Sequence, residues 1–356
     1  MDSRHFANAL IATLILSSPA WSQVPNRPDL TPRPQIEIER IDPAELQIRP
    51  LAFGEMESLS ADESALGPMG RVAAVTRNHE MLFTGQFFPD TRFEMVSLPS
   101  GQALGSFALP NLSFGNPSGA SSAVGEALGV EDRESVLVLF DSCLVALFRW
   151  HLGQLSLTRF LPGPPPYQGL RSMRCIDIAQ AADGRYFIST TEQVEGVIED
   201  LGFVSRYDPE TQSWQRKNRF DDVTLVKGAA LAFDAVRNDL ALVASVGDEH
   251  KLIRTSLDLE PLQIATLPAT VNNAEELVSF AGLAAVATRM QDDSWSLLLV
   301  DMQGDIGDRL PFESPIRALA LQSKATQLAA LSGATIWMLG LHNGAGLHRV
   351  PLTRSE

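Results

Sequence analysis

Acidic residues recur in the polar segments that separate apolar, strand-like stretches of this chain. The clearest groups are Asp221-Asp222, Asp248-Glu249, Asp292-Asp293 and four acids in residues 192–201, namely Glu192, Glu195, Glu199 and Asp200. Carboxylate oxygens that converge on one point bind hard divalent cations such as calcium, and a carboxylate-rich surface attracts a basic partner. Aspartate is also a favoured turn residue for purely structural reasons. The role of these acids therefore depends on where the fold places them.

No enzyme motif accompanies the acids, and the sequence predicts no catalytic residue. The histidines are scattered without an HxxxH or HExxH pair, and two cysteines are too few for a structural zinc site. No Gly-x-Ser-x-Gly elbow and no phosphate-binding glycine loop occurs, and residues 115–119 read as a plain loop. His342 and His348 flank the last predicted hairpin and are expected to approach each other.

The two cysteines, Cys143 and Cys175, favour one disulfide bond if the protein reaches an oxidising compartment. The bond would close a loop of about 30 residues and stabilise the fold by about 3 kcal/mol through chain entropy. Cys143 also lies in an apolar run, which fits two buried thiols. We expect the disulfide, with two thiols as the alternative.

Residues 1–22 have the organisation of an export signal. Arg4 precedes an apolar stretch over residues 6–16, and Ala20 and Ser22 are the small residues that a signal peptidase reads before a cut at Gln23. The stretch is too short to span a bilayer, although a retained anchor is the alternative. We expect a periplasmic protein with no membrane span after removal of the signal.

Residues 23–50 are rich in proline and predict an extended segment, with residues 35–41 and 45–48 able to add an edge strand. The formal net charge of the whole chain is −15. Such a protein repels phosphate backbones, so nucleic acid and anionic lipid are excluded as partners.

Short β-strands in repeated groups would position the acids. The groups span 40 to 58 residues and close on an apolar residue followed by proline, at Leu109-Pro110, Leu161-Pro162, Leu267-Pro268, Leu310-Pro311 and Val350-Pro351. Repeats of this size are typical of propellers and solenoids, whose units bury their faces against their neighbours. We predict an all-β fold, a single β-propeller of six or seven four-stranded blades over residues 51–356.

Each repeat divides into four predicted strands. In the fourth repeat these are residues 229–233, 240–246, 251–257 and 262–267, and in the sixth they are 316–321, 327–331, 335–341 and 346–350. Because the sixth repeat has four strands of its own, a strand borrowed from the amino-terminal side is optional. The segment before Arg71 is expected to complete a degraded seventh repeat or to pair as an extra strand. Alanine-rich runs among the first strands also fit short helices, but their length favours strands.

Two turn motifs carry a resemblance to known proteins. The sequence Ala182-Asp183-Gly184-Arg185-Tyr186 and the sequence from Tyr207-Asp208-Pro209 to Trp214 are similar to turns of exported bacterial β-propellers of the WD40-like and quinoprotein-like superfamily. The resemblance implies the propeller fold. No Trp-Asp dipeptide closes a repeat, and the tryptophan-docking repeat of quinoproteins occurs at most once, so the resemblance implies neither a quinone cofactor nor a catalytic set.

In a propeller, the turns between second and third strands and the connections between blades emerge on one face. That face would collect the following acids: Asp90, Asp141, Glu192, Glu195, Glu199, Asp200, Asp221, Asp222, Asp248, Glu249, Glu275, Glu276, Asp292 and Asp293. Two long insertions would join them, residues 162–174 with Tyr167 at the tip, and residues 192–201 as a short amphipathic turn.

Two functions follow from this face. The favoured one is a protein- or ligand-binding scaffold whose acidic face contacts a basic exported protein or a small ligand, without a cofactor. Its contact residues would be Tyr167, Glu192, Glu195, Glu199, Asp200, Asp248, Glu249, Asp292 and Asp293. The alternative is a metal-dependent propeller hydrolase or lactonase with a calcium-like cation at the axis, for which Asp221, Asp222, Asn272 and Asn273 are the candidate ligands.

Overall fold

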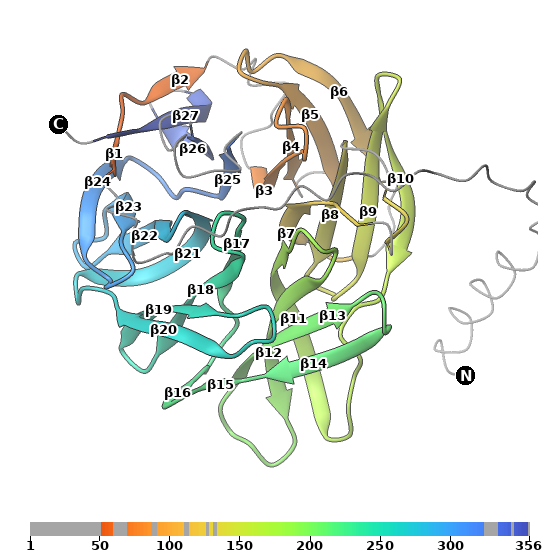
Figure 1. Cartoon of the computed structure of the whole chain (residues 1–356), viewed down its shortest axis with the longest axis vertical. Helices are drawn as coiled ribbons and strands as arrows, with labels where there is room; N and C mark the ends of the chain where they lie inside the picture. Colours follow the sequence, from red (N-terminus) through yellow and green to blue (C-terminus); the bar gives the residue numbers. More distant parts are fainter. Residues whose placement is uncertain are drawn as a thin grey trace, which may run out of the picture. The chain divides into compact units, whose positions relative to one another are not determined.

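Five four-stranded β-sheets and one sheet of five strands form the blades of a propeller, which confirms the predicted all-β fold and sets the blade number at six (Figure 1). The computed structural model describes residues 51–59, 70–86, 91–109, 114–125, 128–130, 134–323, 334–342 and 345–354. The predicted signal segment, the proline-rich segment 23–50 and its edge strands lie outside the described residues. Within the described part of the chain, no helix is long and apolar enough to cross a membrane.

The first five blades are each an antiparallel meander of four consecutive strands. Blade 1 is β3 (Gly70–Val75), β4 (Met81–Gln86), β5 (Arg92–Ser97) and β6 (Ala103–Ala108). Blade 2 is β7 (Pro117–Ser122), β8 (Ser135–Phe140), β9 (Val145–His151) and β10 (Gln154–Leu161). Blade 3 is β11 (Leu170–Gln180), β12 (Tyr186–Val194), β13 (Leu201–Asp208) and β14 (Ser213–Lys217).

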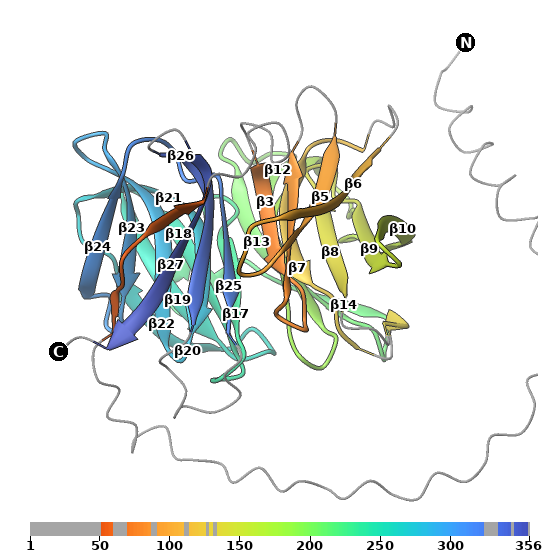
Figure 2. The same ribbon diagram turned by 90° about the horizontal axis from the view of Figure 1, so that it is seen from above.

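The chain then makes a small hairpin, β15 (Arg219–Phe220) and β16 (Val223–Thr224), before it enters the fourth blade. Blade 4 is β17 (Ala230–Asp234), β18 (Asp239–Val246), β19 (Glu249–Thr255) and β20 (Pro261–Thr266). Blade 5 is β21 (Val271–Phe280), β22 (Leu283–Met290), β23 (Trp295–Val300) and β24 (Ile306–Phe312). In the side view of the ring, the strands run along its axis (Figure 2).

Blade 6 closes the ring with strands from both sides of the sequence. It consists of β25 (Ala318–Gln322), β26 (Thr335–His342) and β27 (Ala345–Arg354), and β27 pairs at its outer edge with β1 (Leu51–Phe53) and β2 (Glu57–Leu59). The prediction that the sixth repeat supplies all four strands is therefore wrong. Its expected second strand, residues 327–331, lies outside the described residues, and β25 pairs directly with β26. The borrowed strands cover the edge that β27 would otherwise expose.

Side-chain contacts reinforce this closure. The Arg349 guanidinium forms an ion pair with Glu57 (2.5 Å), and the Phe53 amide donates to Asp308 Oδ2 of blade 5 (2.8 Å). His348 is fully buried: its Nδ1 lies 3.0 Å from Ser58 Oγ, and its Nε2 lies 3.0 Å from the Gly340 carbonyl oxygen. The predicted approach of the two histidines is confirmed, with 5.7 Å between the ring centres of His342 and His348, but His348 serves the closure of the ring.

The hydrophobic core lies between blades rather than within them. Each of its apolar clusters joins two neighbouring blades, and the clusters together follow the whole ring. Between blades 1 and 2 the contact is aromatic, with Phe93 4.8 Å from Phe148 and 5.3 Å from Phe83 between ring centres. Packing of this kind stabilises radial sheets because each blade buries both faces.

The innermost strands form a closed ring around the axis. Each of β3, β7, β11, β17 and β21 contacts the next, and β25 contacts both β21 and β3. Small residues permit the close approach: a Cβ atom at Gly119 of β7 would lie 2.6 Å from Asp177 Oδ1 of β11. Residues 115–119, expected to be a plain loop, in part form β7, because proline is tolerated as the first residue of a strand.

A buried ion network links blades 4 and 5. Arg254 of β19 is 1 % exposed and lies 2.7 Å from both Asp234 and Asp239. Asp234 also accepts hydrogen bonds from the backbone amides of Ala281 (3.0 Å) and Gly282 (2.8 Å) in the β21–β22 turn. Every charge in this network has a partner, which is the condition for burying charges without a large desolvation penalty.

Candidate functional site

One face of the propeller carries the turns between second and third strands, and we call it the loop face. In the part of the chain that is described, these turns are residues 141–144, 195–200, 247–248 and 291–294. The connections between blades emerge on the same side, as the meander topology requires. The Cys175 amide of β11 accordingly donates to the Asp141 carbonyl in the first of these turns (3.1 Å).

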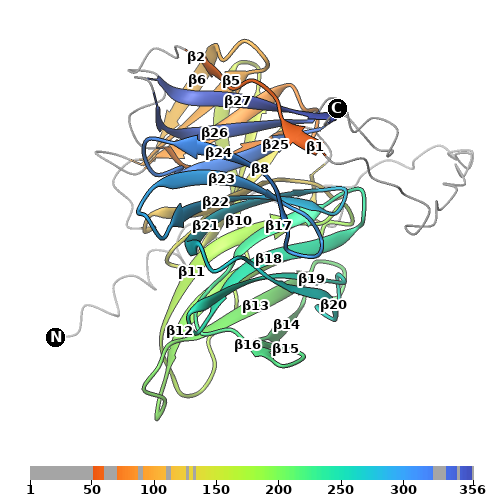
Figure 3. The ribbon, with the colours of Figure 1, turned by 90° about the vertical axis from the view of Figure 1, so that its left-hand side faces the viewer.

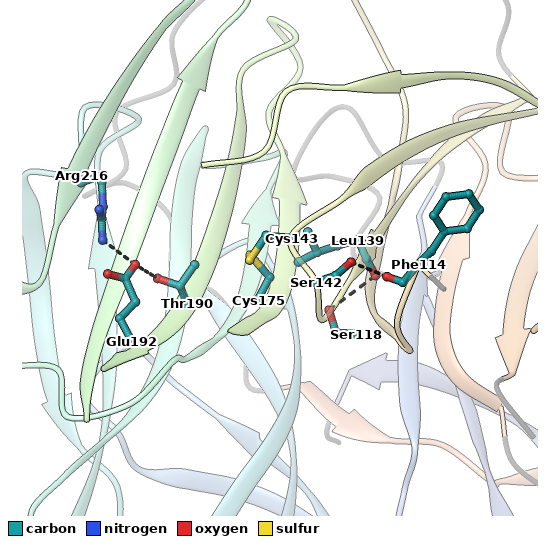
Figure 4. The surroundings of a disulfide bond; sticks show 9 residues. All are labelled: Phe114, Ser118, Leu139, Ser142, Cys143, Cys175, Thr190, Glu192 and Arg216. Atoms are coloured by element: carbon teal, nitrogen blue, oxygen red, sulfur yellow. Dashed lines mark hydrogen bonds and ion pairs between the residues drawn. A yellow bond between two sulfur atoms is a disulfide. The ribbon is translucent and has the colours of Figure 1, made fainter. Parts of the chain in front are cut away.

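A disulfide bond joins blades 2 and 3 at the loop face. Cys143 in the turn 141–144 is bonded to Cys175 of β11, with 5.0 Å between their Cα atoms (Figure 4). The Asp141 carboxylate in the same turn accepts from the backbone amide (2.9 Å) and the side chain (3.1 Å) of Asn116. The turn 141–144 is thus fixed by Asn116 on one side and by Cys175 on the other. It restrains β11 near Cys175.

Blade 3 contains the longest strand of the described residues, β11. β11 has 11 residues and β12 has nine, and they pair as far as Leu170 and Val194. Figure 3 shows this end of blade 3 projecting beyond its neighbours at the lower left. The turn 195–200 forms the tip of the projection, and the loop 162–169 lies beside it, joined by a hydrogen bond from the Glu195 amide to the Gly169 carbonyl (2.7 Å).

A buried carboxylate anchors the projection. Glu192 Oε1 accepts from the Thr190 hydroxyl (2.6 Å) and forms an ion pair with Arg216 (Figure 4). Glu192 Oε2 accepts from the Tyr167 hydroxyl (2.9 Å). The Arg216 guanidinium lies over the Tyr167 ring (4.5 Å) and the Phe203 ring (4.4 Å). Desolvation, and then the hydrogen bond to Glu192, raise the pKa of Tyr167. Three segments of the chain meet at this carboxylate: β12, β14 and the loop 162–169.

The anchor changes the assignment of two predicted contact residues. Glu192 was expected on an acidic surface, but its side chain is fully buried and has no free edge for a partner. Tyr167 was expected at the tip of a presenting loop, but it packs against Arg216 and donates to Glu192. Their role is to position the projection, because a buried carboxylate requires partners of this kind.

The tip itself differs from the amphipathic turn that was expected. β12 continues to Val194, and Gly196 with φ 82° turns the chain, so no helical turn forms. The apolar side chains consequently point to solvent: Val197 is 43 % exposed and Ile198 is 102 % exposed. Glu195, Glu199 and Asp200 around them are exposed as well. We call residues 195–200 the blade-3 tip.

Further acids line the loop face, at the places that the sequence predicts. Asp248, Asp292 and Asp293 are exposed in the turns of blades 4 and 5, and Glu249 is exposed at the start of β19. Glu249 pairs with Lys251 (2.9 Å) and Asp293 with Arg289 (3.0 Å). Hydrogen bonds from Ser294 lower the pKa of Asp292, so it is charged at neutral pH. Asp90 lies outside the described residues.

The predicted metal ligands lie in separate parts of the ring. Asp221 and Asp222 are exposed in the turn of the β15–β16 hairpin, whereas Asn272 and Asn273 begin β21 of blade 5. The Asn273 side chain donates to Glu275 (2.9 Å). In the described ranges, no three histidine, cysteine, aspartate or glutamate side chains are grouped so that they could hold a metal ion.

The axis contains a small polar cavity that sequence reasoning missed. Every innermost strand lines this cavity of about 30 Å³, and its two carboxyl groups are Asp177 of β11 and Glu276 of β21. The Asp177 oxygens accept from the backbone amides of Ile178 (2.7 Å) and Leu231 (2.7 Å). Both acids are half-buried and line the cavity.

Burial governs the electrostatics of this pair. Desolvation raises the pKa of Asp177 to about 7, against the opposing effect of its two amide donors. Desolvation and the charge of Asp177 raise the pKa of Glu276 well above its usual range. Glu276 was assigned to the exposed acidic face, and Asp177 was not singled out. The sequence signal that could have revealed the pair is the presence of a charged residue, Asp177, in the first strand of a blade, which lies next to the axis.

Comparison with known proteins identifies the fold. No protein-family model matches the chain, and no curated protein matches it. Among solved structures, a luciferin-regenerating enzyme is 11% identical with a TM-score of 0.57, and covers 83% of this chain and 94% of its own. A gluconolactonase from Xanthomonas campestris is 15% identical with a TM-score of 0.54 over 86% of this chain and 99% of that one.

A calcium-binding protein, regucalcin, from Agrobacterium tumefaciens is 12% identical with a TM-score of 0.53, over 86% of this chain and 96% of that one. The WD40 repeats of RRP9 are similar as well, at 12% identity and a TM-score of 0.50 over 84% of this chain and 98% of that one. At such identities the likeness shows the fold alone. It confirms the resemblance to β-propellers in general and assigns no specific family.

The axial carboxyl pair does not fit a resident calcium ion. Calcium takes six to eight oxygen ligands in proteins. The cavity offers two carboxyl groups, and both oxygens of Asp177 already accept backbone amides. Apart from Ser118, the remaining lining residues have apolar side chains or none.

Proposed function

We propose that this chain is an exported binding module that docks a partner protein on its loop face, with the blade-3 tip as the apolar anchor. The observation that carries this function is the pair Val197 and Ile198, exposed at the apex of a projecting hairpin. Apolar side chains in such a position gain free energy when a partner covers them.

Preorganisation supports the proposal. The hairpin below the tip is held by the buried Glu192 carboxylate, by Tyr167 and by Arg216. The neighbouring disulfide further restrains β11 against blade 2. A loop that is already held in place loses less conformational entropy on binding, so more of the contact energy appears as affinity.

The negative charge of the loop face indicates what kind of partner protein would bind there. Exposed acids surround the tip and continue over the loop face, at Glu195, Glu199, Asp200, Asp248, Glu249, Asp292 and Asp293. Lys251 and Arg289 offset two of them. The formal net charge of −15 adds a long-range negative field. The matching partner is an exported protein with an apolar groove bordered by lysine and arginine.

Site-specific photo-crosslinking tests this function. A photoreactive phenylalanine analogue replaces Ile198, and in the control it replaces Leu152, which is 88 % exposed in the β9–β10 turn on the other face. In cells of the source organism we expect one defined adduct from position 198 and none from position 152. The adduct should decrease when Asp248 and Asp292 are changed to lysine. Equal labelling from both positions would contradict the proposal.

A metal-dependent propeller lactonase is the second candidate. The fold likeness to the gluconolactonase structure supports it, whereas the described residues contain no group of metal ligands. Thermal melting with calcium and with a chelator separates the candidates, because a tight site raises the melting temperature by mass action. A calcium-dependent rise together with hydrolysis of an aldonolactone would favour the enzyme over the binding module.

A further inference from the structure

We propose that Asp177 and Glu276 are a proton-linked pair at the propeller axis, which holds a proton in the folded ring under mildly acidic conditions and loosens the ring when that proton leaves. This device concerns the stability of the scaffold and is independent of whether a partner binds to the loop face.

The geometry brings the two acids together from different blades. Asp177 belongs to β11 of blade 3 and Glu276 to β21 of blade 5, with β17 of blade 4 between them in the ring. Both side chains line the same cavity of about 30 Å³, which has room for one or two water molecules. β17 itself contacts the pair, since the Leu231 amide donates to Asp177 Oδ2.

No positive charge lines the cavity among the described residues. The other lining side chains are Val72 and Ala73 from β3, Ser118, Gly119 and Ala120 from β7, Leu231 from β17, Leu277 from β21 and Leu319 from β25. The neighbouring Glu275 adds a further negative charge. Two carboxylates in such a place repel each other and lack solvation, so one of them takes up a proton.

The hydrogen bonds indicate which acid carries the proton. Asp177 accepts two amide hydrogen bonds at 2.7 Å, which favour its ionised form. Glu276 has one backbone hydrogen bond, with Leu319, which favours its ionised form. The charges of Asp177 and Glu275 favour its neutral form. Glu276 is therefore the member of the pair that keeps its proton to the higher pH.

The direction of the pH effect follows from these shifts. Aspartate and glutamate in an unfolded chain have pKa values near 4, whereas burial raises the pKa of Asp177 to about 7 and that of Glu276 well above its usual range. Between these limits the folded protein binds more protons than the unfolded chain. The contribution to stability is thus fully present below about pH 4 and is lost as the pH rises through the folded-state pKa values of the pair, of which that of Asp177 is about 7.

Replacing Glu276 with its neutral isostere tests the pair. The purified protein and its Glu276→Gln variant are melted at about pH 5 and about pH 8.5, on either side of the folded-state pKa of Asp177. We expect the variant to melt at least about 2–4 °C above the unmodified protein at the higher pH and to lose this advantage at the lower pH. The matched control is Glu210→Gln, an exposed acid in the β13–β14 turn away from the axis, which should follow the unmodified protein.

Two further measurements keep the test decisive. Infrared difference spectra of the unmodified protein, taken across the same pH range, should lose a protonated carboxyl band, and absence of that band at mildly acidic pH would overturn the proposal even if Glu276→Gln did not fold. Parallel melting curves for Glu276→Gln and the unmodified protein would also overturn it. So would a rise in melting temperature with calcium at the higher pH that Glu276→Gln abolishes, since the pair would then bind a cation.

Discussion

Arg216 and Glu192 form an ion pair whose carboxylate is fully buried and whose guanidinium is 19% exposed, at the base of the projecting end of blade 3. The pair connects β14 to β12 and, through Tyr167, to the loop before β11. Residues 192–201, which the sequence predicts to be a solvent-exposed acidic insertion, are thus organised around the buried carboxylate of Glu192.

Loss of this acid should destabilise blade 3. Glu192→Ala leaves Arg216 and the Tyr167 hydroxyl without their acceptor, and breaking a buried pair by removing one partner lowers the free energy of unfolding by about 3 kcal/mol. Urea unfolding measures the loss. The control is Glu249→Ala, which removes an exposed pair with Lys251 and should change the free energy by less than about 1 kcal/mol. Equal losses would show that Glu192 does not anchor the hairpin.

The bond between Cys143 and Cys175 should contribute to stability without determining the fold. The double substitution of both cysteines with serine is expected to lower the free energy of unfolding by about 3 kcal/mol, because the unfolded chain regains the entropy of the closed loop. Denaturation of the variant, and of the unmodified protein with and without a reducing agent, gives the comparison. If reduction of the unmodified protein left its unfolding midpoint unchanged, the bond would not stabilise the ring.

Gly119 should be intolerant of a side chain because β7 lies so close to β11. In Gly119→Ala the new methyl group would lie 2.6 Å from Asp177 Oδ1 and 2.8 Å from the Ile178 nitrogen, and overpacking of this kind destabilises by about 1–3 kcal/mol. Gly346→Ala is the matched control, since no atom lies within 4 Å of a Cβ at that position. A similar melting temperature for both variants would contradict the close packing at the axis.

The sequence predicts what depends on local pattern. In blade 4 the expected second strand, residues 240–246, corresponds to β18 (Asp239–Val246), because apolar runs between turn residues are a local signal. Ring closure escapes such analysis: the pairing of Leu51 with Arg354 joins opposite ends of the described chain, and nothing near Leu51 marks its partner. The short strand Pro117–Ser122 was missed because proline and glycine are typical of turns.

The residues of the candidate site also differ in whether local sequence pattern predicts their position. Exposed acids such as Asp248 and Asp292 lie in turns, where sequence alone places them. The burial of Glu192 depends on Arg216, which lies on another strand. The meeting of Asp177 and Glu276 depends on the diameter of the ring and on the register of two strands in different blades. Such contacts are properties of the closed propeller, and only the three-dimensional structure brings them to light.

His348 should give the stability a second pH dependence, of opposite sign to that of the axial pair. Burial lowers the pKa of His348 below its usual value near 6.5, against the effect of the Gly340 and Ala345 carbonyl groups. As the pH falls below about 6.5, the unfolded chain takes up a proton that the folded ring resists, so the free energy of unfolding decreases. In His348→Gln this decrease should be absent, whereas the exposed control His151→Gln should retain it.

Urea unfolding at several pH values measures both variants, and parallel profiles for His348→Gln and the unmodified protein would contradict the assignment. Because the contributions of His348 and Glu276 oppose each other in mild acid, the difference between each variant and the unmodified protein is the quantity that separates them.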